Sequence, residues 1–359
     1  MMDIQIFHCE ETASWNSAVE RCAWHDFYHL AEYHLLHKQE GQGILIVISE
    51  DEKTIAFPLL VRPIEEVGGL EDFSGYFDAT SVYGYPGPIT NAETDIRFLK
   101  QAGWVLGNIL RDQKIISVFS RLHPILGNDK YVFVGAAIPI GETISIDLTL
   151  PEEQQTKLYR KNHQRDIKKA LHNNLICFED KEWSRYDDFI RLYYATMERV
   201  GAEVRYFFSR EYFDELRVAL KDSLRLFIVT QEDVVLSAGL FTLVRGIVQY
   251  HLGASDPNFM QHHAASKLLF DTVRRWASKY NATVFHLGGG VGGKNDSLFN
   301  FKRGFSDRIH TFWIWKYIVD KCCYEQALAA RHAWLTMNNL ALTENSYFPA
   351  YRASPQNKG

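Results

Sequence analysis

Cysteine is scarce in this sequence, which holds five in 359 residues. None belongs to a C-x-x-C pair, and no histidine stands at zinc-finger spacing from any of them. The pattern excludes a disulfide framework and predicts free thiols in a reducing compartment. No cluster with metal-ligand spacing is visible, so we expect no metal site. The five positions are Cys9, Cys22, Cys177, Cys322 and Cys323.

Long apolar runs are also missing. No stretch approaches the roughly 20 uninterrupted apolar residues of a membrane-spanning helix. The first residues, MMDIQIFHCEETASW, include acidic side chains and lack the apolar core of a signal peptide. These absences together predict a cytoplasmic location.

Positive charge is not in excess. The chain has 39 lysines and arginines against 44 aspartates and glutamates, a formal net charge of −5. A general nucleic-acid binder usually carries a basic excess, so the balance predicts no DNA partner. It leaves room for a local basic patch, and such a run extends from Lys157 through Lys169. That run fits contact with tRNA or a lipid phosphate, and it equally fits a solvated helix face.

What the sequence does contain is enough chain for two domains. In the second half, apolar spacing predicts a mixed order of helices and strands, which is typical of an α/β sheet with helices on its faces. We expect helices at 156–172, 186–200, 210–221, 263–280 and 295–302, strands at 175–179, 224–230, 234–244, 247–254 and 283–287, and a strand pair between 308 and 319.

The first half repeats this order. We expect strands at 3–7, 43–49, 54–62, 115–120 and 142–148, with helices at 13–23, 26–38 and 93–112. The segment IAFPLLVR at 55–62 resembles SAGLFTLVR at 237–245, which indicates an internal duplication. The predicted domains are residues 1–150 and 151–320, followed by a helical tail from 321 to 359 whose end, Ser354–Gly359, is expected to be disordered.

A glycine-rich turn follows the strand at 283–287. Gly288, Gly290 and Gly293 fit G-x-G-x-x-G, and Gly288 to Lys294 fit G-x-x-x-x-G-K. However, Asn295 stands where a phosphate loop needs serine or threonine, and too few strands remain for a nucleotide domain. The glycines are better explained as a turn that lets the chain pass between neighbouring strands.

Two motifs carry a resemblance. The first is Phe301-Lys302-Arg303-Gly304-Phe305 after the strand and glycine turn, and the second is Asp78 to Pro88, DATSVYGYPGP. With the duplicated element order, they resemble the FemABX-type peptidyltransferases, tandem GNAT proteins, and their exopolysaccharide-associated branch. The resemblance covers most of residues 1–320 and implies two tandem GNAT domains, with a degenerate first domain that binds the acceptor and a catalytic second domain.

The resemblance also implies residue roles. Lys302 matches a lysine that stabilises the oxyanion of acyl transfer, and Phe301 would shield it from water, which strengthens its effect. Arg205 matches an arginine that grips an acceptor phosphate, although an ion pair with a nearby glutamate explains it almost as well. Tyr250 matches an acceptor-site tyrosine. Strand alternation places it on the face opposite Gln249 and His251, without deciding which face lines the site.

In ordinary GNAT enzymes a glycine-rich loop before the long helix holds pyrophosphate through backbone amides. An alanine and a serine replace the expected glycines here, which weakens acetyl-CoA as donor and favours aminoacyl-tRNA. Tyr83 and Tyr85 form an aromatic loop that would line a sugar or precursor groove, or simply pack in a turn. The candidate donor-binding residues are Gln261, His262, His263, Ala264, Ala265 and Ser266.

The expected function is therefore amide formation between an activated acyl group, aminoacyl-tRNA foremost, and an amine on a phosphorylated sugar or cell-wall precursor, with possible peripheral contact to a lipid-linked substrate. No separate cofactor is expected, because the acyl donor is a co-substrate. Two alternatives stay open: an acyl-CoA-dependent N-acyltransferase of polysaccharide or sugar-nucleotide synthesis, and a non-catalytic protein that binds a glycan precursor. An intact F-K-x-G-F motif argues against the latter.

Overall fold

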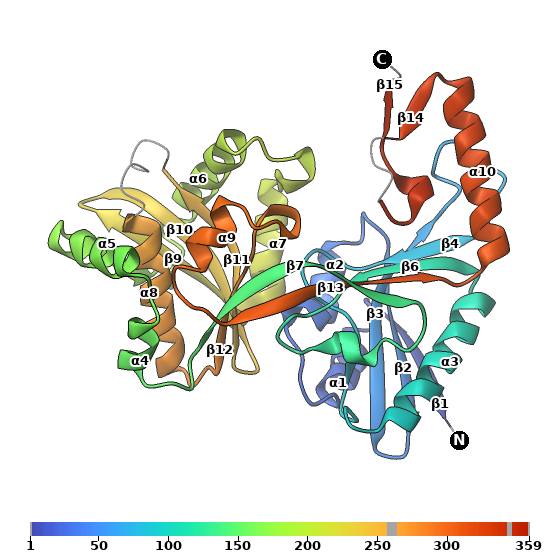
Figure 1. Ribbon diagram of the computed structural model, residues 1–359, viewed down its shortest axis with the longest axis horizontal. Helices are drawn as coiled ribbons and strands as arrows, with labels where there is room; N and C mark the ends of the chain where they lie inside the picture. Colours follow the sequence, from blue (N-terminus) through green and yellow to red (C-terminus); the bar gives the residue numbers. More distant parts are fainter. Residues whose placement is uncertain (1, 257–263, 343–346, 358–359) are drawn as a thin grey trace. The chain divides into compact units, whose positions relative to one another are not determined.

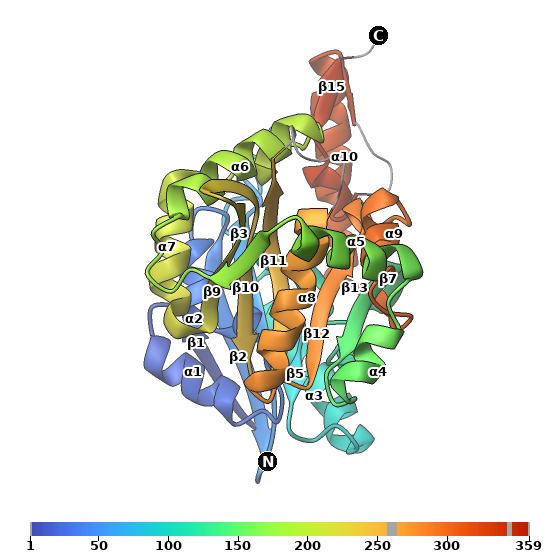
Figure 2. The ribbon, with the colours of Figure 1, turned by 90° about the vertical axis from the view of Figure 1, so that its left-hand side faces the viewer.

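The computed structural model of the protein describes residues 2–256, 264–342 and 347–357. Figures 1 and 2 show the chain in two views. The structure divides into two compact units, residues 1–140 with 312–359, and residues 141–311. The last segment of the chain, expected to be a separate tail from 321, is thus part of the first unit, whereas the sequence suggested continuous domains at 1–150 and 151–320.

The first unit is built on a mixed sheet whose strands run in the order β1-β2-β3-β4-β6-β13. Neighbouring strands are antiparallel except for β4 and β6, which are parallel. The short β5, Ile89–Thr90, pairs with β3. The strand bounds are β1 Asp3–His8, β2 Gln42–Glu50, β3 Lys53–Pro63, β4 Phe77–Thr80, β6 Ile115–Arg121 and β13 Ile309–Ile318.

Successive side chains of β2 point to opposite faces of the sheet and pack into two hydrophobic clusters. Ile44, Ile46 and Ile48 pack with α3, whereas Leu45 and Val47 pack with α1 and α2 on the opposite face. Cys323 and its neighbours on α10 form a further apolar cluster in this unit. The helix bounds are α1 Thr12–Glu20, α2 Ala31–Leu36, α3 Ile96–Asp112 and α10 Lys321–Met337.

The second unit repeats this topology strand for strand. Its order is β8-β9-β10-β11-β12-β7, again antiparallel except for the parallel pair β11 and β12. The segments 55–62 and 237–245 lie in the third strand of their units, β3 and β10, so the topology supports the duplication. The strand bounds are β8 Leu175–Glu179, β9 Leu224–Gln231, β10 Val234–Val244, β11 Ile247–Ser255, β12 Val284–Gly289 and β7 Ala136–Asp147.

Helices cover both faces of the second sheet. The buried residues of α5 and α8 join one core with Phe227, Val229, Phe241 and Phe285, while α6 contacts β10 and β11. Figure 1 places α5 and α8 on one side of this sheet and α6 and α7 on the other. The helix bounds are α4 Glu152–Lys157, α5 Lys161–His172, α6 Tyr186–Arg199, α7 Arg210–Leu220, α8 Ala264–Lys279 and α9 Ser297–Lys302.

The sixth strands of the two units are exchanged: each follows the fifth strand of the other unit along the chain. β7 comes after β6 along the chain but pairs with β12, and β13 comes after β12 but pairs with β6. Sequence patterns indicate which residues form strands but not which strands pair, so this exchange could not be predicted. It also explains why continuous domain boundaries do not describe the units.

Three local expectations were wrong. The helix expected at 156–172 is two helices, because Arg160 has an extended backbone and its amide donates to Gly304 O. The strand pair expected between 308 and 319 is the single strand β13. Of the end expected to be disordered, Ser354–Gly359, residues 355–357 form β15, Pro355–Asn357, because their backbone pairs with β14, Leu340–Leu342, and residues 358–359 lie outside the described part.

The five cysteines are free thiols, as expected. In the part of the chain that the structure describes, no helix has both the length and the apolar character required to cross a bilayer.

Candidate acyl-transfer site

The site lies where the parallel pair of the second unit comes apart. β11 and β12 pair at three positions, from Ile247–Val284 to Gln249–His286, although β11 continues to Ser255 and β12 to Gly289. Opposite β7, the register of β12 also shifts between His286 and Gly288. Backbone groups beyond this point are released from their parallel partner, so they can bind side chains or a substrate.

Lys302 occupies the position beside this opening. It is the last residue of the short helix α9, its side chain is 5% exposed, and Nζ donates a hydrogen bond to Gly289 O at 2.6 Å. No carboxylate oxygen lies within 4.0 Å of Nζ among the described residues. The F-K-x-G-F motif thus places a buried ammonium group against the last carbonyl of β12.

Burial controls the charge of this lysine. Removal from water lowers the pKa of Lys302 from 10.5 to about 7, while the negative charge of Asp296 acts in the opposite direction. The Tyr250 ring, with its centroid 5.4 Å from Nζ, gives a cation–π contact. Near neutral pH the group therefore exists both as the ammonium and as the free amine.

Aromatic rings form the surroundings of Lys302. Phe305 is fully buried and Phe301 half-buried, and their ring centroids lie 5.3 and 5.5 Å from Phe270. Phe270 in turn lies 4.7 Å from the Tyr250 ring. This cluster keeps the local dielectric constant low, so a charge at Nζ acts strongly on a neighbouring oxygen.

Asp296 holds the glycine turn and α9 together. One carboxylate oxygen accepts from Phe299 N at 2.9 Å, as an N-cap, and the other accepts from Val291 N at 2.9 Å. A Cβ at Gly290 would lie 2.4 Å from the same carboxylate, so the turn requires glycine there. Because α9 is one short helix, the turn is not a phosphate loop followed by a long helix, in agreement with the sequence argument.

His163 fixes the motif from the side of α5. Its Nε2 donates to Phe301 O at 3.0 Å, and burial lowers its pKa to about 4, so the ring is neutral. A Cβ at Gly304 would lie 2.1 Å from this nitrogen. The glycine of F-K-x-G-F is thus required by the close approach of an imidazole ring.

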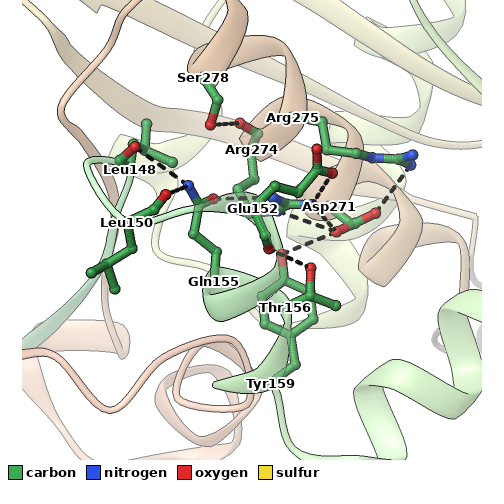
Figure 3. A network of polar contacts seen from close by, with 10 residues as sticks. All are labelled: Leu148, Leu150, Glu152, Gln155, Thr156, Tyr159, Asp271, Arg274, Arg275 and Ser278. Atoms are coloured by element: carbon green, nitrogen blue, oxygen red, sulfur yellow. Dashed lines mark hydrogen bonds and ion pairs between the residues drawn. The ribbon is translucent and has the colours of Figure 1, made fainter.

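A buried polar network holds α4 and Tyr159, in the link between α4 and α5, against α8 (Figure 3). Arg274 on α8 donates to Gln155 Oε1 at 3.0 Å and to Asp271 Oδ1 at 3.1 Å, and the Tyr159 hydroxyl donates to the same Asp271 oxygen at 3.1 Å. The Tyr159 ring also packs edge-on against Phe305 at 5.1 Å. The network fastens α4 and the link before α5 to the long helix α8.

The structure decides which face of β11 lies beside the lysine. Tyr250 points toward Lys302, whereas Gln249 Oε1 accepts a hydrogen bond from His286 Nδ1 at 2.6 Å, which ties Gln249 to β12. A β-bulge falls at His251, because Leu240 pairs with Leu252 and Phe241 with Tyr250, so the alternation of faces is interrupted at this residue.

The remaining predicted residues of this unit are only partly described. Arg205 lies in the short 3-10 helix Val204–Tyr206, and its side chain is outside the described part. Of the predicted donor loop, residues 261–263 (Gln261, His262 and His263) also lie outside it. Ala264 and Ala265 begin α8, and the Ser266 hydroxyl lies 2.9 Å from Ser255 Oγ.

Tyr83 and Tyr85 belong to the first unit, where both are half-buried. Tyr83 O accepts from the Tyr33 hydroxyl at 3.0 Å, and the Tyr85 ring packs edge-on against Phe312 at 5.1 Å. His29 Nε2 donates to Pro86 O at 2.8 Å. The loop is thus held in one shape by buried side chains.

Sequence reasoning missed Asp296 and His163. An N-cap signal was available for the first, because aspartate three residues before Phe299 is typical of a helix start. For the second, His163, Ile167 and Ala170 repeat at helical spacing and are all buried, which would have marked the inner face of the basic run.

Comparisons with known proteins bear on the type of domain and on the fold. Residues 157–303 match the family model of the acetyltransferase (GNAT) domain. The second unit thus carries an acyltransferase domain. Its motif residue Lys302 lies within the matched segment, at the end of α9.

Solved structures extend the likeness to both units. FemX superposes with a TM-score of 0.69 at 14% identity, covering 90% of this chain and 99% of that chain. The C-terminal domain of a putative lysylphosphatidylglycerol synthetase from Agrobacterium fabrum gives 0.54 at 11% identity, covering 90% and 96%. L-PGS from Bacillus licheniformis gives 0.54 at 11% identity, covering 89% and 96%. No curated protein sequence matches significantly.

At sequence identities of 11–14%, the similarity to these solved structures establishes the fold alone. The chain has the FemABX-type tandem GNAT fold, as the sequence motifs predicted. Together with the family match, this makes the protein an acyltransferase.

Proposed function

We propose that this acyltransferase moves an aminoacyl group from tRNA to an amine on a cell-wall or polysaccharide precursor. The observation that carries the proposal is the buried ammonium of Lys302 beside the opening between β11 and β12, with no carboxylate to neutralise it among the described residues. FemX and two lysylphosphatidylglycerol synthetase structures share this fold, and the lysyl group in the name of the latter supports an aminoacyl group as the one transferred.

The chemistry follows from the charge of Lys302. A neutral acceptor amine attacks the ester carbonyl, the N–C bond forms, and negative charge collects on the carbonyl oxygen. The ammonium stabilises that oxygen, and loss of one such donor typically costs about 10²–10³ in rate. The C–O bond then breaks, and the proton lost by the amine ends on the departing ribose oxygen.

The choice of donor rests on the start of α8. Ala264 and Ser266 stand where a GNAT pyrophosphate loop has glycines, and Ala264 is 6% exposed. A Cβ limits close approach of a pyrophosphate to the backbone. The GNAT match keeps acyl-CoA as the competing donor.

Lys302→Met tests the lysine, because methionine keeps length and burial but not charge. We expect transfer from aminoacyl-tRNA to fall at least 100-fold with the fold retained, as judged by circular dichroism. Lys279→Met, on the exposed end of α8, is the matched control. Unchanged transfer in Lys302→Met would refute the role of the lysine, whereas absence of transfer by the unmodified protein would favour a protein that only binds its precursor.

A second measurement tests the donor. The unmodified protein is assayed with radiolabelled aminoacyl-tRNA and with acetyl-CoA, each with a lipid-linked and a nucleotide-linked amino-sugar acceptor. We expect label transfer from the tRNA. Transfer from the thioester alone, or coenzyme A that copurifies with the protein, would overturn the donor assignment.

A further inference from the structure

The outer face of α5 carries a row of cations that the Lys302 site does not use. Lys161, Arg165, Lys168 and Lys169 are all exposed, at spacings of four, three and one residues, so they lie along one side of the helix. Arg165 pairs with Asp166 at 3.1 Å, while the three lysines have no ion-pair partner among the described residues. We call these four residues the α5 row.

The inner face of α5 is occupied. Ile167 and Ala170 belong to the core of the second unit, and Lys267 on α8 pairs with Asp166 at 2.7 Å. A helix that lies on a membrane needs its apolar face free to enter the lipid. Because α5 turns that face inward and presents cations outward, it fits a partner that offers phosphates in water.

The row begins beside the reacting group. Arg160, directly before α5, donates from its amide to Gly304 O at 2.8 Å, and His163 donates to Phe301 O at 3.0 Å. These two bonds join the start of α5 to both sides of Lys302 in the F-K-x-G-F motif. One end of a polyanion bound along the row, the end at the start of α5, would therefore lie near Lys302.

The dimensions fit a nucleic-acid backbone. From Lys161 to Lys169 the helix rises about 12 Å, at roughly 1.5 Å per residue. One strand of a duplex carries a phosphate about every 3.4 Å along its axis, so the row faces roughly three to four phosphates. The chain as a whole has a net charge of −5, so this attraction is local to the row.

We infer that the α5 row docks the phosphate backbone of an RNA whose 3′ end carries the acyl group to Lys302. The inference deepens the proposed function and rests on it, because an RNA-borne donor is part of that function. It adds the surface that holds the donor and predicts that this surface acts by charge rather than by base sequence.

The test is the affinity of the full-length protein for a short RNA hairpin with a single-stranded CCA end, measured by fluorescence anisotropy at several salt concentrations. In K161Q/K168Q/K169Q we expect the affinity to fall tenfold or more. The slope of log K against log salt should decrease by about 2–3, since each lost phosphate contact removes roughly 0.7–0.9.

The matched control is K181Q/K221Q/K279Q, which removes the same charge from exposed lysines elsewhere in the second unit. It should bind RNA as the unmodified protein does, and melting temperatures show that both variants fold. An equal loss in the two variants, or an unchanged salt slope in the α5 variant, overturns the inference. So does loss of binding to vesicles of anionic phospholipid without loss of RNA binding.

Failure of the inference and failure of the proposed function give different results. If Lys302→Met abolishes transfer while the α5 variant binds RNA normally, the function stands and the docking surface is wrong. If the α5 variant loses RNA affinity while Lys302→Met still transfers, the surface stands and the catalytic assignment is wrong.

Discussion

The two units share one topology but treat buried charge in opposite ways at their parallel strand pairs. In the first unit, Asp78 on β4 is fully buried and bound by Arg62 at 2.8 Å, by Arg352 and by the Tyr351 hydroxyl at 3.2 Å. In the second unit, Lys302 is equally removed from water but contacts a carbonyl and a ring. A matched buried charge serves the fold, whereas an unmatched one marks a candidate functional group.

Two further buried side chains of the first unit also have hydrogen-bond partners. His123 Nε2 donates to Asp26 Oδ2 at 3.0 Å, and Asn128 donates to Pro86 O at 3.0 Å, which fixes the loop that holds Tyr83 and Tyr85. Both His123 and Asp26 are fully buried. The first unit therefore has paired buried groups near its parallel strands, whereas the second unit has a buried lysine that titrates near neutral pH.

The largest expected effect breaks the matched charge of the first unit. Asp78→Ala leaves Arg62 and Arg352 without their shared carboxylate, so we expect a loss of about 3–5 kcal/mol in the free energy of unfolding. Urea denaturation followed by tryptophan fluorescence measures it. The control is Glu153→Ala, which breaks an exposed pair with Lys157 and should cost little. Equal losses in both variants would contradict the comparison.

The second prediction concerns the unmatched charge. Below pH 7, Lys302 is charged in the folded and the unfolded protein, so its burial opposes folding in full. Between pH 7 and 10.5 the unfolded chain keeps a proton that the folded one has lost, so this opposition weakens as pH rises.

Lys302→Met should therefore be stabilised relative to the unmodified protein more at low pH than at high pH. Between pH 6 and pH 9 the difference in unfolding free energy should shrink by roughly 2–3 kcal/mol. Urea denaturation at both pH values measures the change. A difference that is constant with pH would show that Lys302 titrates normally.

The third prediction concerns the close approach at Gly304. Gly304→Ala forces a methyl group against His163 Nε2, and overpacking of this kind typically costs about 1–3 kcal/mol. The double variant His163→Ala with Gly304→Ala removes the clash and should regain part of that stability in thermal melts. No recovery would mean that the backbone, rather than the imidazole, requires glycine.

The smallest expected effect concerns Asp296. Asp296→Asn keeps an N-cap but removes the charge that raises the pKa of Lys302, so the lysine should lose its proton at lower pH. We expect the alkaline limb of the pH–rate profile to move down by less than about one pH unit, with kcat at pH 6 nearly unchanged. An unmoved limb would assign it to another group.

Local sequence information was enough for most elements and for the motif. The spacing of apolar residues gave the meander from Leu224 to Ser255 and the long helix from Ala264 to Lys279 within one or two residues. The match between 55–62 and 237–245 gave the duplication. These features depend on neighbours along the chain, which the sequence states directly.

The helix break before α5 could not be read in this way. Residues 158–160, Leu-Tyr-Arg, contain no proline or glycine, so they give no local signal for a break. The break exists because the Arg160 amide binds a carbonyl at residue 304, far along the chain. The strand β15 likewise forms because of a partner elsewhere in the chain, since it pairs with β14.

The sequence by itself determined the two α/β halves, their shared order and the identity of Lys302 as the residue to examine. The tertiary structure alone decided that this lysine is buried against Gly289 O beside Tyr250, that β7 and β13 are exchanged, and that the α5 row starts beside the motif. The physical reason is that charge state and strand partner depend on groups brought together from distant positions, and periodicity along one segment carries no record of them.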